Sequence, residues 1–217
     1  MRTIRTGVMM VRAELPSRAL LITSVAPQEG KTVVVANLAI ALAQARRKVL
    51  LVDADMRKPR LGSLFPVPGE GPGLVQLLSE DLTLDAVVRP TDIAQLSLLA
   101  CLIVAHQPSE LLESPRLVTV IAAAKERFDF VLFDSPPLLA VTDAVVLASR
   151  LDGVVLVVKG GSTPRELLRR GLAVLADAHA APAGAVLNLV AMRGRGARYH
   201  PYPYQYYRRY YGREERT

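Results

Sequence analysis

The sequence has a single cysteine, Cys101, among its 217 residues. One cysteine excludes an internal disulfide, and a thiolate metal site would need further ligands that the three widely separated histidines do not supply. Because the surrounding residues are apolar, we expect Cys101 to be a small core residue. This usage agrees with a protein that works in a reducing cytoplasm.

Long apolar runs are also missing. The longest mostly apolar stretch, residues 32–45, is too short to span a bilayer and contains Asn37 and Gln44. The N-terminus lacks the uninterrupted apolar region and the small-residue cleavage site of a signal peptide. We therefore expect a cytoplasmic chain that reaches the inner face of the plasma membrane only through a partner or a surface contact.

Apolar residues make up 51% of the chain, and β-branched runs alternate with helical segments. The predicted strands are Ala19–Ser24, Val49–Val52, Leu96–Leu99, Phe130–Phe133, Val154–Val158 and Ala185–Leu189. The predicted helices are Thr32–Ala45, Pro115–Arg127, Asp143–Ser149 and Pro164–Ala178. Nearly continuous apolar strands separated by helices predict an α/β fold with a doubly wound, mostly parallel sheet.

Two segments interrupt this alternation. Residues 58–90 are rich in Pro and Gly and predict an irregular excursion with one or two short helices, such as Leu74–Glu80. From residue 193 onward there is only a sequence rich in Arg, Tyr, Pro and Gly without helical or strand period. We therefore predict one domain over residues 1–192 and a disordered tail over residues 193–217.

The first chemical motif runs from Ser24 to Thr32, between a predicted strand and a predicted helix. In a phosphate loop, backbone amides surround the phosphates, a lysine neutralises their charge and a hydroxyl binds Mg²⁺. The pattern departs from the strict one at Val25, where glycine is usual. The expected nucleotide-binding residues are Pro27, Gln28, Glu29, Gly30, Lys31, Thr32 and Val33.

Carboxylates follow two further strands. Asp53 and Asp55 end the strand before Arg57, and Asp134 ends the strand before Ser-Pro-Pro. Ligands of doubly wound sheets bind at the carboxyl ends of the strands, so these acids and the phosphate loop should meet there. We expect ATP and Mg²⁺ as cofactors, with the metal held by Thr32, Asp53 and Asp134, and Lys31 facing the phosphates.

A catalytic base is also required if a tyrosine accepts the phosphoryl group, because a phenol has a pKa of about 10. Asp55 is the first candidate and Asp53 the second, and the residues alone do not decide between them. The expected catalytic set is therefore Lys31, Asp53, Asp55 and Asp134.

These motifs resemble the bacterial tyrosine kinases of capsule and exopolysaccharide synthesis, which share the P-loop fold of the MinD and ParA ATPases. The likeness continues through Pro108-Ser-Glu-Leu-Leu112, Asp152-Gly-Val-Val155 and Gly184-Ala-Val-Leu-Asn188. It implies a homo-oligomeric ring, a membrane-spanning activator of polysaccharide synthesis and a cognate phosphotyrosine phosphatase. Arg2 and Arg5 match two arginines of the family's Glu-x-x-Arg-x-x-Arg ring-assembly helix, whose glutamate would precede Met1.

The resemblance also assigns a role to the tail. All seven tyrosines of the chain lie there, as Tyr199, Tyr202, Tyr204, Tyr206, Tyr207, Tyr210 and Tyr211. In the family such a cluster is autophosphorylated between neighbouring subunits. Stacking and phosphate contacts give an Arg/Tyr tail a mechanism for binding nucleic acid, but nothing in the rest of the chain supports that partner.

Two other functions are open at this point. One is an ATPase switch of the MinD or ParA kind, although those proteins carry a second lysine where Ala26 stands here. The other is a nucleotide-gated scaffold for polysaccharide export whose tail binds partners without being a substrate. The segment 101–107 lacks the Gly and Asn expected from the resemblance, and no catalytic role is assigned to it.

Overall fold

The computed structural model describes residues 1–11, 13–15, 17–66 and 71–190. Its centre is a seven-stranded sheet in the order β3-β4-β2-β5-β1-β6-β7. The strands are β1 (Arg18–Ser24), β2 (Val49–Asp53), β3 (Arg89–Pro90), β4 (Leu96–Leu99), β5 (Phe130–Asp134), β6 (Gly153–Lys159) and β7 (Pro182–Asn188). All neighbours are parallel except β3 and β4, which are antiparallel.

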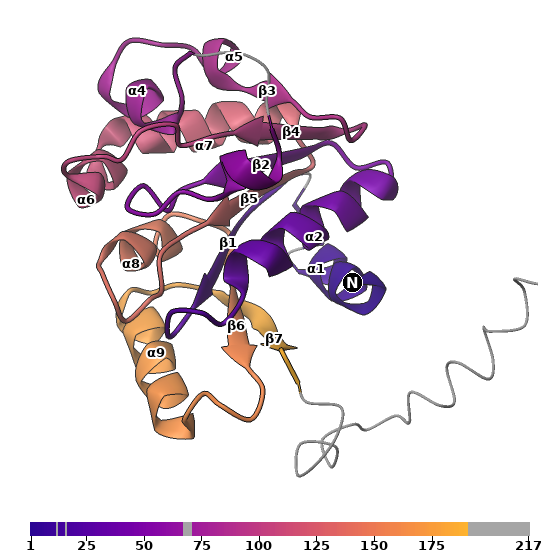
Figure 1. The fold of residues 1–217 in the computed structure, drawn as a ribbon, viewed down its shortest axis with the longest axis vertical. Helices are drawn as coiled ribbons and strands as arrows, with labels where there is room; N and C mark the ends of the chain where they lie inside the picture. The colour runs from indigo at the N-terminus through magenta and orange to yellow at the C-terminus, as the bar shows by residue number, and fades with distance from the viewer. Residues whose placement is uncertain (12, 16, 67–70, 191–217) are drawn as a thin grey trace, which may run out of the picture.

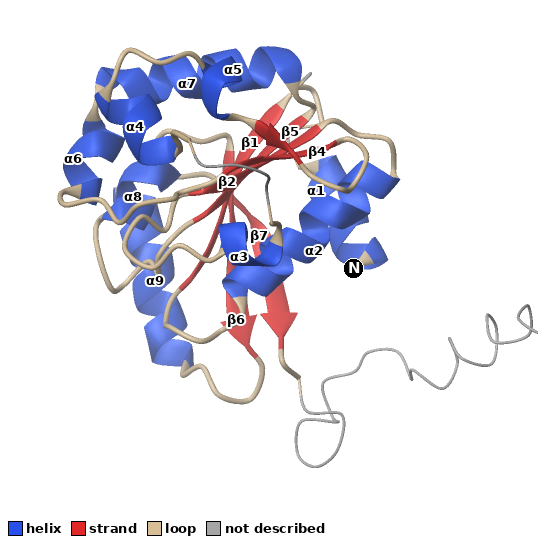
Figure 2. Cartoon of the chain, turned by 45° about the horizontal axis from the view of Figure 1, so that its top comes forward, coloured by secondary structure: helices blue, strands red, loops and turns tan. Residues whose placement is uncertain are grey.

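Helices cover both faces of the sheet (Figures 1 and 2). One face carries α1 (Arg2–Met10), α2 (Lys31–Gln44) and α3 (Leu61–Leu64). The other carries α4 (Leu74–Ser79), α5 (Leu84–Val87), α6 (Pro108–Glu113), α7 (Pro115–Arg127), α8 (Asp143–Ala148) and α9 (Arg165–Asp177). This is the doubly wound architecture that the sequence predicts.

Alternation along each strand explains why the strands are apolar throughout. In β1, Leu20 and Ile22 pack under α2, while Ala19 and Leu21 face the opposite helix layer. All four side chains are fully buried. A strand buried on both faces is therefore mostly apolar, and the buried Thr23 and Ser24 at the end of β1 are satisfied by hydrogen bonds to the carbonyls of Pro136 and Ala26.

The segment between β2 and β4 differs most from the prediction. Its described part contains three short helices, α3, α4 and α5, and the edge strand β3, where one or two helices were predicted. Helices α1 and α6 also lie outside the helices predicted from periodicity. Strand β7 begins three residues earlier than predicted and ends at Asn188, because Leu189 has a left-handed backbone with φ of 53°.

Among the described residues no helix combines the length and apolarity needed to cross a membrane. Cys101 is buried, with 5% of its surface exposed, and its thiol donates a hydrogen bond to the carbonyl of Ile103 at 3.0 Å. The prediction of a core cysteine is confirmed.

Candidate nucleotide and phosphoryl-transfer site

The phosphate loop connects β1 to the N-terminus of α2. Gly30 adopts a left-handed conformation with φ of 84°, and a Cβ at this position would collide with the side-chain amide of Asn188. Lys31 is the first residue of the helix. Glycine is therefore required here by both backbone and space, and α2 presents its free amides at the carboxyl edge of the sheet, where an anion is favoured.

Glu29 braces this loop from within. Its side chain is buried, and one carboxylate oxygen accepts a hydrogen bond from the amide of Ala26 at 2.9 Å. The other oxygen accepts from the amide of Lys159 at 3.3 Å and from the Thr163 hydroxyl. Asn188 donates its side-chain amide to the Glu29 carbonyl at 3.0 Å. The Glu29 carboxylate thus connects the phosphate loop to the end of β6. The backbone N–H groups at the start of α2 stay available for a ligand.

The exposed part of the loop lies before Gly30. Pro27 and Gln28 are exposed, and Gln28 has a positive φ of 61°. Val33, in the first turn of α2, is 56% exposed. The predicted nucleotide-binding residues therefore form one continuous, accessible turn, apart from the buried Glu29 side chain.

Three acids converge beside this turn because β2, β5 and β1 are adjacent in the sheet. Asp53 and Asp134 stand opposite each other in the register of β2 and β5. Lys31 Nζ lies 3.3 Å from Asp55 Oδ2 and 3.9 Å from Asp134 Oδ1. The structure brings together all four residues that the sequence predicts as catalytic.

Asp53 and Asp55 have different surroundings. Asp53 is fully buried, and its Oδ2 accepts hydrogen bonds from the amides of Arg60 at 3.0 Å and Leu61 at 2.8 Å. Asp55 keeps 7% of its surface exposed and faces Lys31. Asp53 is therefore anchored to the start of α3, whereas Asp55 lies at the accessible edge of the site.

Burial changes the acidity of two of these groups. Desolvation raises the pKa of Asp134 to about 7, although the nearby Lys31 charge acts in the opposite direction. Desolvation also raises the pKa of Asp53 to about 6, against the hydrogen bonds from Leu61 and Arg60. Raised pKa values at carboxylates gathered in one site are typical of functional positions.

The donor set fits Mg²⁺. Asp53 Oδ1 and both carboxylate oxygens of Asp134 are buried without a hydrogen-bond partner among the described residues. Buried polar atoms are normally paired, so unpaired oxygens indicate a ligand position. Mg²⁺ is usually bound through one or two carboxylates together with substrate phosphates, which matches a site with Asp53 and Asp134 beside the phosphate loop.

A polar cluster that the sequence did not predict lies beside these acids. Arg57 donates to both carboxylate oxygens of Asp143, each at 2.9 Å, and Asp143 is fully buried. The Ser109 hydroxyl donates to Asp143 Oδ1 at 2.7 Å. Burial alone would raise the pKa of Asp143, but the hydrogen bonds from Arg57 and Ser109 hold it below its usual range. The cluster fixes the loop after β2 to the first residues of α6 and α8.

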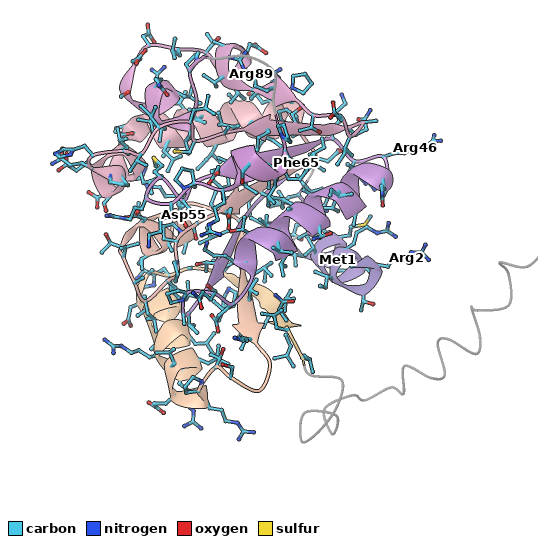
Figure 3. All side chains as sticks on the ribbon, in the orientation of Figure 1. Met1, Arg2, Arg46, Asp55, Phe65 and Arg89 are labelled. Carbon is cyan, nitrogen blue, oxygen red and sulfur yellow. The ribbon has the colours of Figure 1, made fainter. Side chains whose placement is uncertain are left out.

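The predicted ring-contact residues, Arg2 and Arg5, lie away from this site. Arg2 is exposed on the far side of the molecule from Asp55 (Figure 3). Arg5 is partly buried against α2 and donates to the carbonyl of Ala41 at 3.4 Å. The seven tyrosines, from Tyr199 to Tyr211, lie outside the described residues.

Comparison with known proteins agrees with this geometry. Residues 24–166 match the AAA domain family. The chain is 35% identical over 187 residues to the tyrosine-protein kinase YwqD of Bacillus subtilis, covering 86% of this chain and 78% of YwqD. This chain is a member of the bacterial tyrosine-protein kinase family. The phosphate loop and the acids described above thus lie in a domain of this kinase family.

Other relatives are much longer than this chain. The chain is 33% identical over 207 residues to the tyrosine-protein kinase Wzc of Salmonella typhimurium and spans 29% of that protein. It spans 28% of the putative tyrosine-protein kinase EpsB of Ralstonia nicotianae.

Solved structures confirm the fold. The kinase domain of the Escherichia coli tyrosine kinase ETK superposes with a TM-score of 0.84 at 32% identity, covering 89% of this chain and 75% of that one. The septum site-determining protein MinD of Pyrococcus horikoshii, complexed with Mg-ADP, gives a TM-score of 0.70 at 27% identity, with coverage of 83% and 73%. The predicted P-loop fold of the MinD type is confirmed.

Proposed function

We propose that this chain is an ATP-dependent protein-tyrosine kinase that phosphorylates the tyrosine cluster of its own C-terminal segment. One observation carries the proposal. Lys31, in the phosphate loop, lies beside three buried carboxylate oxygens of Asp53 and Asp134 that accept no hydrogen bond among the described residues. The same chain has seven tyrosines, all within residues 199–211. A site suited to Mg-ATP and a concentrated set of acceptors for its phosphate thus occur in one chain.

In this proposal the loop residues bind and orient the nucleotide. Backbone N–H groups from residue 28 to residue 33 and the Lys31 ammonium would face the phosphate oxygens, and Thr32, Asp53 and Asp134 would hold Mg²⁺. Mg²⁺ supplies charge neutralisation between the phosphates when it is bound. Because catalysis of phosphoryl transfer depends on position and charge, these contacts account for most of the expected rate.

The contacts favour Asp55 over Asp53 as the base. Asp53 is fully buried, its Oδ2 accepts two backbone hydrogen bonds, and its Oδ1 is the oxygen assigned here to Mg²⁺. Asp55 keeps 7% of its surface exposed and its Oδ2 lies beside Lys31, which faces the phosphates in this proposal. The tyrosine proton passes to Asp55 while the phenol oxygen bonds to the γ-phosphorus, and the bond from that phosphorus to the bridging oxygen breaks to release ADP.

We further propose that this activity regulates capsule or exopolysaccharide synthesis and export. The names of the relatives YwqD and Wzc support the kinase activity, and the family resemblance supports the pathway. The proposed partners are a membrane-spanning activator, further copies of the same chain in a ring with Arg2 and Arg5 at its contacts, and a phosphotyrosine phosphatase. Partner-mediated recruitment would bring the chain to the inner face of the plasma membrane.

The proposal is tested by incubating the purified chain with Mg-ATP and mapping phosphotyrosine by mass spectrometry, with and without a candidate activator segment. Phosphate on residues 199–211 is expected. ATP hydrolysis without phosphotyrosine in either condition would instead support a nucleotide switch of the kind that MinD represents, and nucleotide binding without turnover would support a scaffold.

A second experiment distinguishes transfer between chains from transfer within one chain. A Lys31→Met chain is mixed with an active chain in which all seven tyrosines are phenylalanine. The first has an acceptor but no catalyst, and the second has a catalyst but no acceptor. Phosphate on the Lys31→Met tail requires transfer between copies, whereas an unlabelled mixture beside a self-labelling wild type indicates transfer within one chain.

A further inference from the structure

The loop after β4 exposes three consecutive large apolar side chains. Leu102, Ile103 and Val104 are 44%, 48% and 65% exposed, between the buried residues Cys101 and Ala105. No other three consecutive residues of the described chain are large, apolar and exposed in this way. Leaving adjacent apolar side chains in water is unfavourable, and contiguous exposed apolar surface commonly marks an interaction site.

This apolar strip, residues 102–104, is held beside the phosphoryl-transfer site. Strand β4 pairs with β2 so that Leu99 stands opposite Val52, which places the following residues next to Asp53. At the far end of the strip, the amide of Ala105 donates to the carbonyl of Met56 at 3.1 Å. Met56 directly follows Asp55, the proposed base. The strip therefore borders the loop that carries the base.

A hollow with one carboxylate begins two residues after the strip. It has a volume of about 380 Å³ and is lined by His106, Gln107, Glu110, Leu111 and Ser114. Glu110 is exposed, and its Oε1 accepts a hydrogen bond from the Gln107 side chain at 2.8 Å. An apolar strip next to a carboxylate suits a ligand that carries both aromatic rings and cations.

We propose that the strip and the neighbouring hollow form a docking surface for the tyrosine cluster of this protein, residues 199–211. The proposal rests on the proposed kinase function and adds the means by which the substrate is recognised. Between residues 193 and 217 the chain has seven tyrosines, seven arginines and two glutamates. Tyrosine rings match the apolar strip, and the arginines match Glu110.

The length of the C-terminal segment is sufficient to reach the strip. Strands β7 and β4 are five interstrand spacings apart in the sheet, which is about 24 Å at ~4.8 Å each. Tyr199 follows Val190, the last described residue, by nine positions, which span at most roughly 30 Å when fully extended. The other six tyrosines are further along the chain, so the segment is long enough to bring several of them to the strip.

The test compares the full-length chain with the variant Leu102→Ser, Ile103→Ser and Val104→Ser. The probe is a fluorescein-labelled peptide of residues 197–213, whose binding is followed by fluorescence anisotropy without ATP and whose phosphorylation is followed with Mg-ATP. Loss of the strip is expected to raise Kd and the peptide KM about tenfold, equivalent to ~1.4 kcal/mol. The kcat and the KM for ATP are expected to stay at the wild-type values.

The control variant is Val118→Ser with Leu172→Ser, which removes side chains that are 54% and 44% exposed on α7 and α9. It is expected to bind the peptide like the wild type. If the strip variant also binds like the wild type, the docking surface is wrong. If the strip variant fails to fold, Val104→Lys tests the same surface by placing a cation against the arginines, and unchanged binding again overturns the proposal.

The two readouts separate this proposal from the kinase function on which it rests. Peptide binding that weakens in the strip variant, with no phosphate transfer by the wild type, would support the surface and reject the kinase. Phosphate transfer whose peptide KM and Kd do not respond to the strip variant would support the kinase and reject the surface.

Discussion

Lys31 and Asp55 form an ion pair across the mouth of the site, with Nζ 3.3 Å from Oδ2. The lysine comes from the first turn of α2 and the aspartate from the loop after β2, so the pair joins the phosphate-binding loop to the proposed base. Both side chains are mostly buried, with 14% and 10% of their surfaces exposed. The Lys31 ammonium and the Asp55 carboxylate thus both lie at the place where we propose that the phosphoryl group is transferred.

Replacement of Lys31 with methionine should abolish phosphoryl transfer without unfolding the domain. Methionine has a similar length but no charge, so the transferring phosphate loses its loop cation, which typically costs two or more orders of magnitude in rate. The measurements are the initial rate of autophosphorylation and the thermal unfolding midpoint. A variant that transfers phosphate at the wild-type rate would show that the site is assigned incorrectly.

Asp55→Asn and Asp53→Asn should fail in different ways. Removal of the proposed base at Asp55 should lower kcat by about 10²–10⁴-fold while Mg-nucleotide still binds. Removal of the Asp53 carboxylate should weaken the Mg²⁺ dependence of nucleotide binding, because one metal ligand is lost. Single-turnover rates and nucleotide titrations at several Mg²⁺ concentrations distinguish these effects, and the reverse pattern would make Asp53 the base.

Arg57→Ala should destabilise the domain, because it removes both charge-assisted hydrogen bonds from a buried carboxylate. The expected cost is about 1.5 kcal/mol, the lower end of the range for hydrogen bonds to charged groups, because the Arg57 side chain is itself 40% exposed and solvent screens the pair. Arg57→Lys keeps the positive charge but cannot form the bidentate pair with Asp143. Its free energy of unfolding should therefore lie between those of the wild type and Arg57→Ala. Denaturant unfolding measures the order, and equal stability of all three chains would contradict the role assigned to the cluster.

The buried acids predict a pH dependence of stability in the absence of Mg²⁺ and nucleotide. Since burial raises the pKa of Asp134 from 3.8 to about 7, the unfolded chain releases this proton at a lower pH than the folded chain does. The contribution of Asp134 to stability must therefore fall as pH rises from about 4 to about 7, and stay constant above that range. The stability difference between wild type and Asp134→Asn should shift in favour of the variant over this window, and a difference independent of pH would contradict the burial of Asp134.

The sheet core was predictable because buried parallel strands leave a direct mark on the sequence. Strands β1, β2, β4 and β5 are mostly apolar in sequence. Asp53 and Asp134 stand at the carboxyl ends of β2 and β5, and the carboxyl ends of parallel strands lie at one edge of the sheet. Strand β3 has only two residues, Arg89 and Pro90, so it has no period to detect. Helix α6 is six residues long and begins with proline, which in isolation reads as a turn.

The polar contacts that support the site were not predictable, because they join distant parts of the chain. Arg57 and Asp143 are 86 residues apart, and Glu29 and Asn188 are 159 apart. Asp143 looks from the sequence like an ordinary residue at the start of a helix. The one signal in the sequence was Arg57, two residues after Asp55 at the end of a buried strand. A cation at such a position usually has an acidic partner, but the sequence does not show which one.

The most direct test of the kinase function replaces all seven tyrosines with phenylalanine in the full-length chain. The globular part contains no tyrosine, so the variant has no tyrosine left to accept phosphate. Radiolabelled ATP is supplied with Mg²⁺, and incorporation and nucleotide binding are measured in parallel. We predict that phosphate incorporation disappears while nucleotide binding keeps its wild-type Kd. Persistent labelling at the wild-type level would place the phosphate on another residue type and contradict a tyrosine kinase that acts on its own tail.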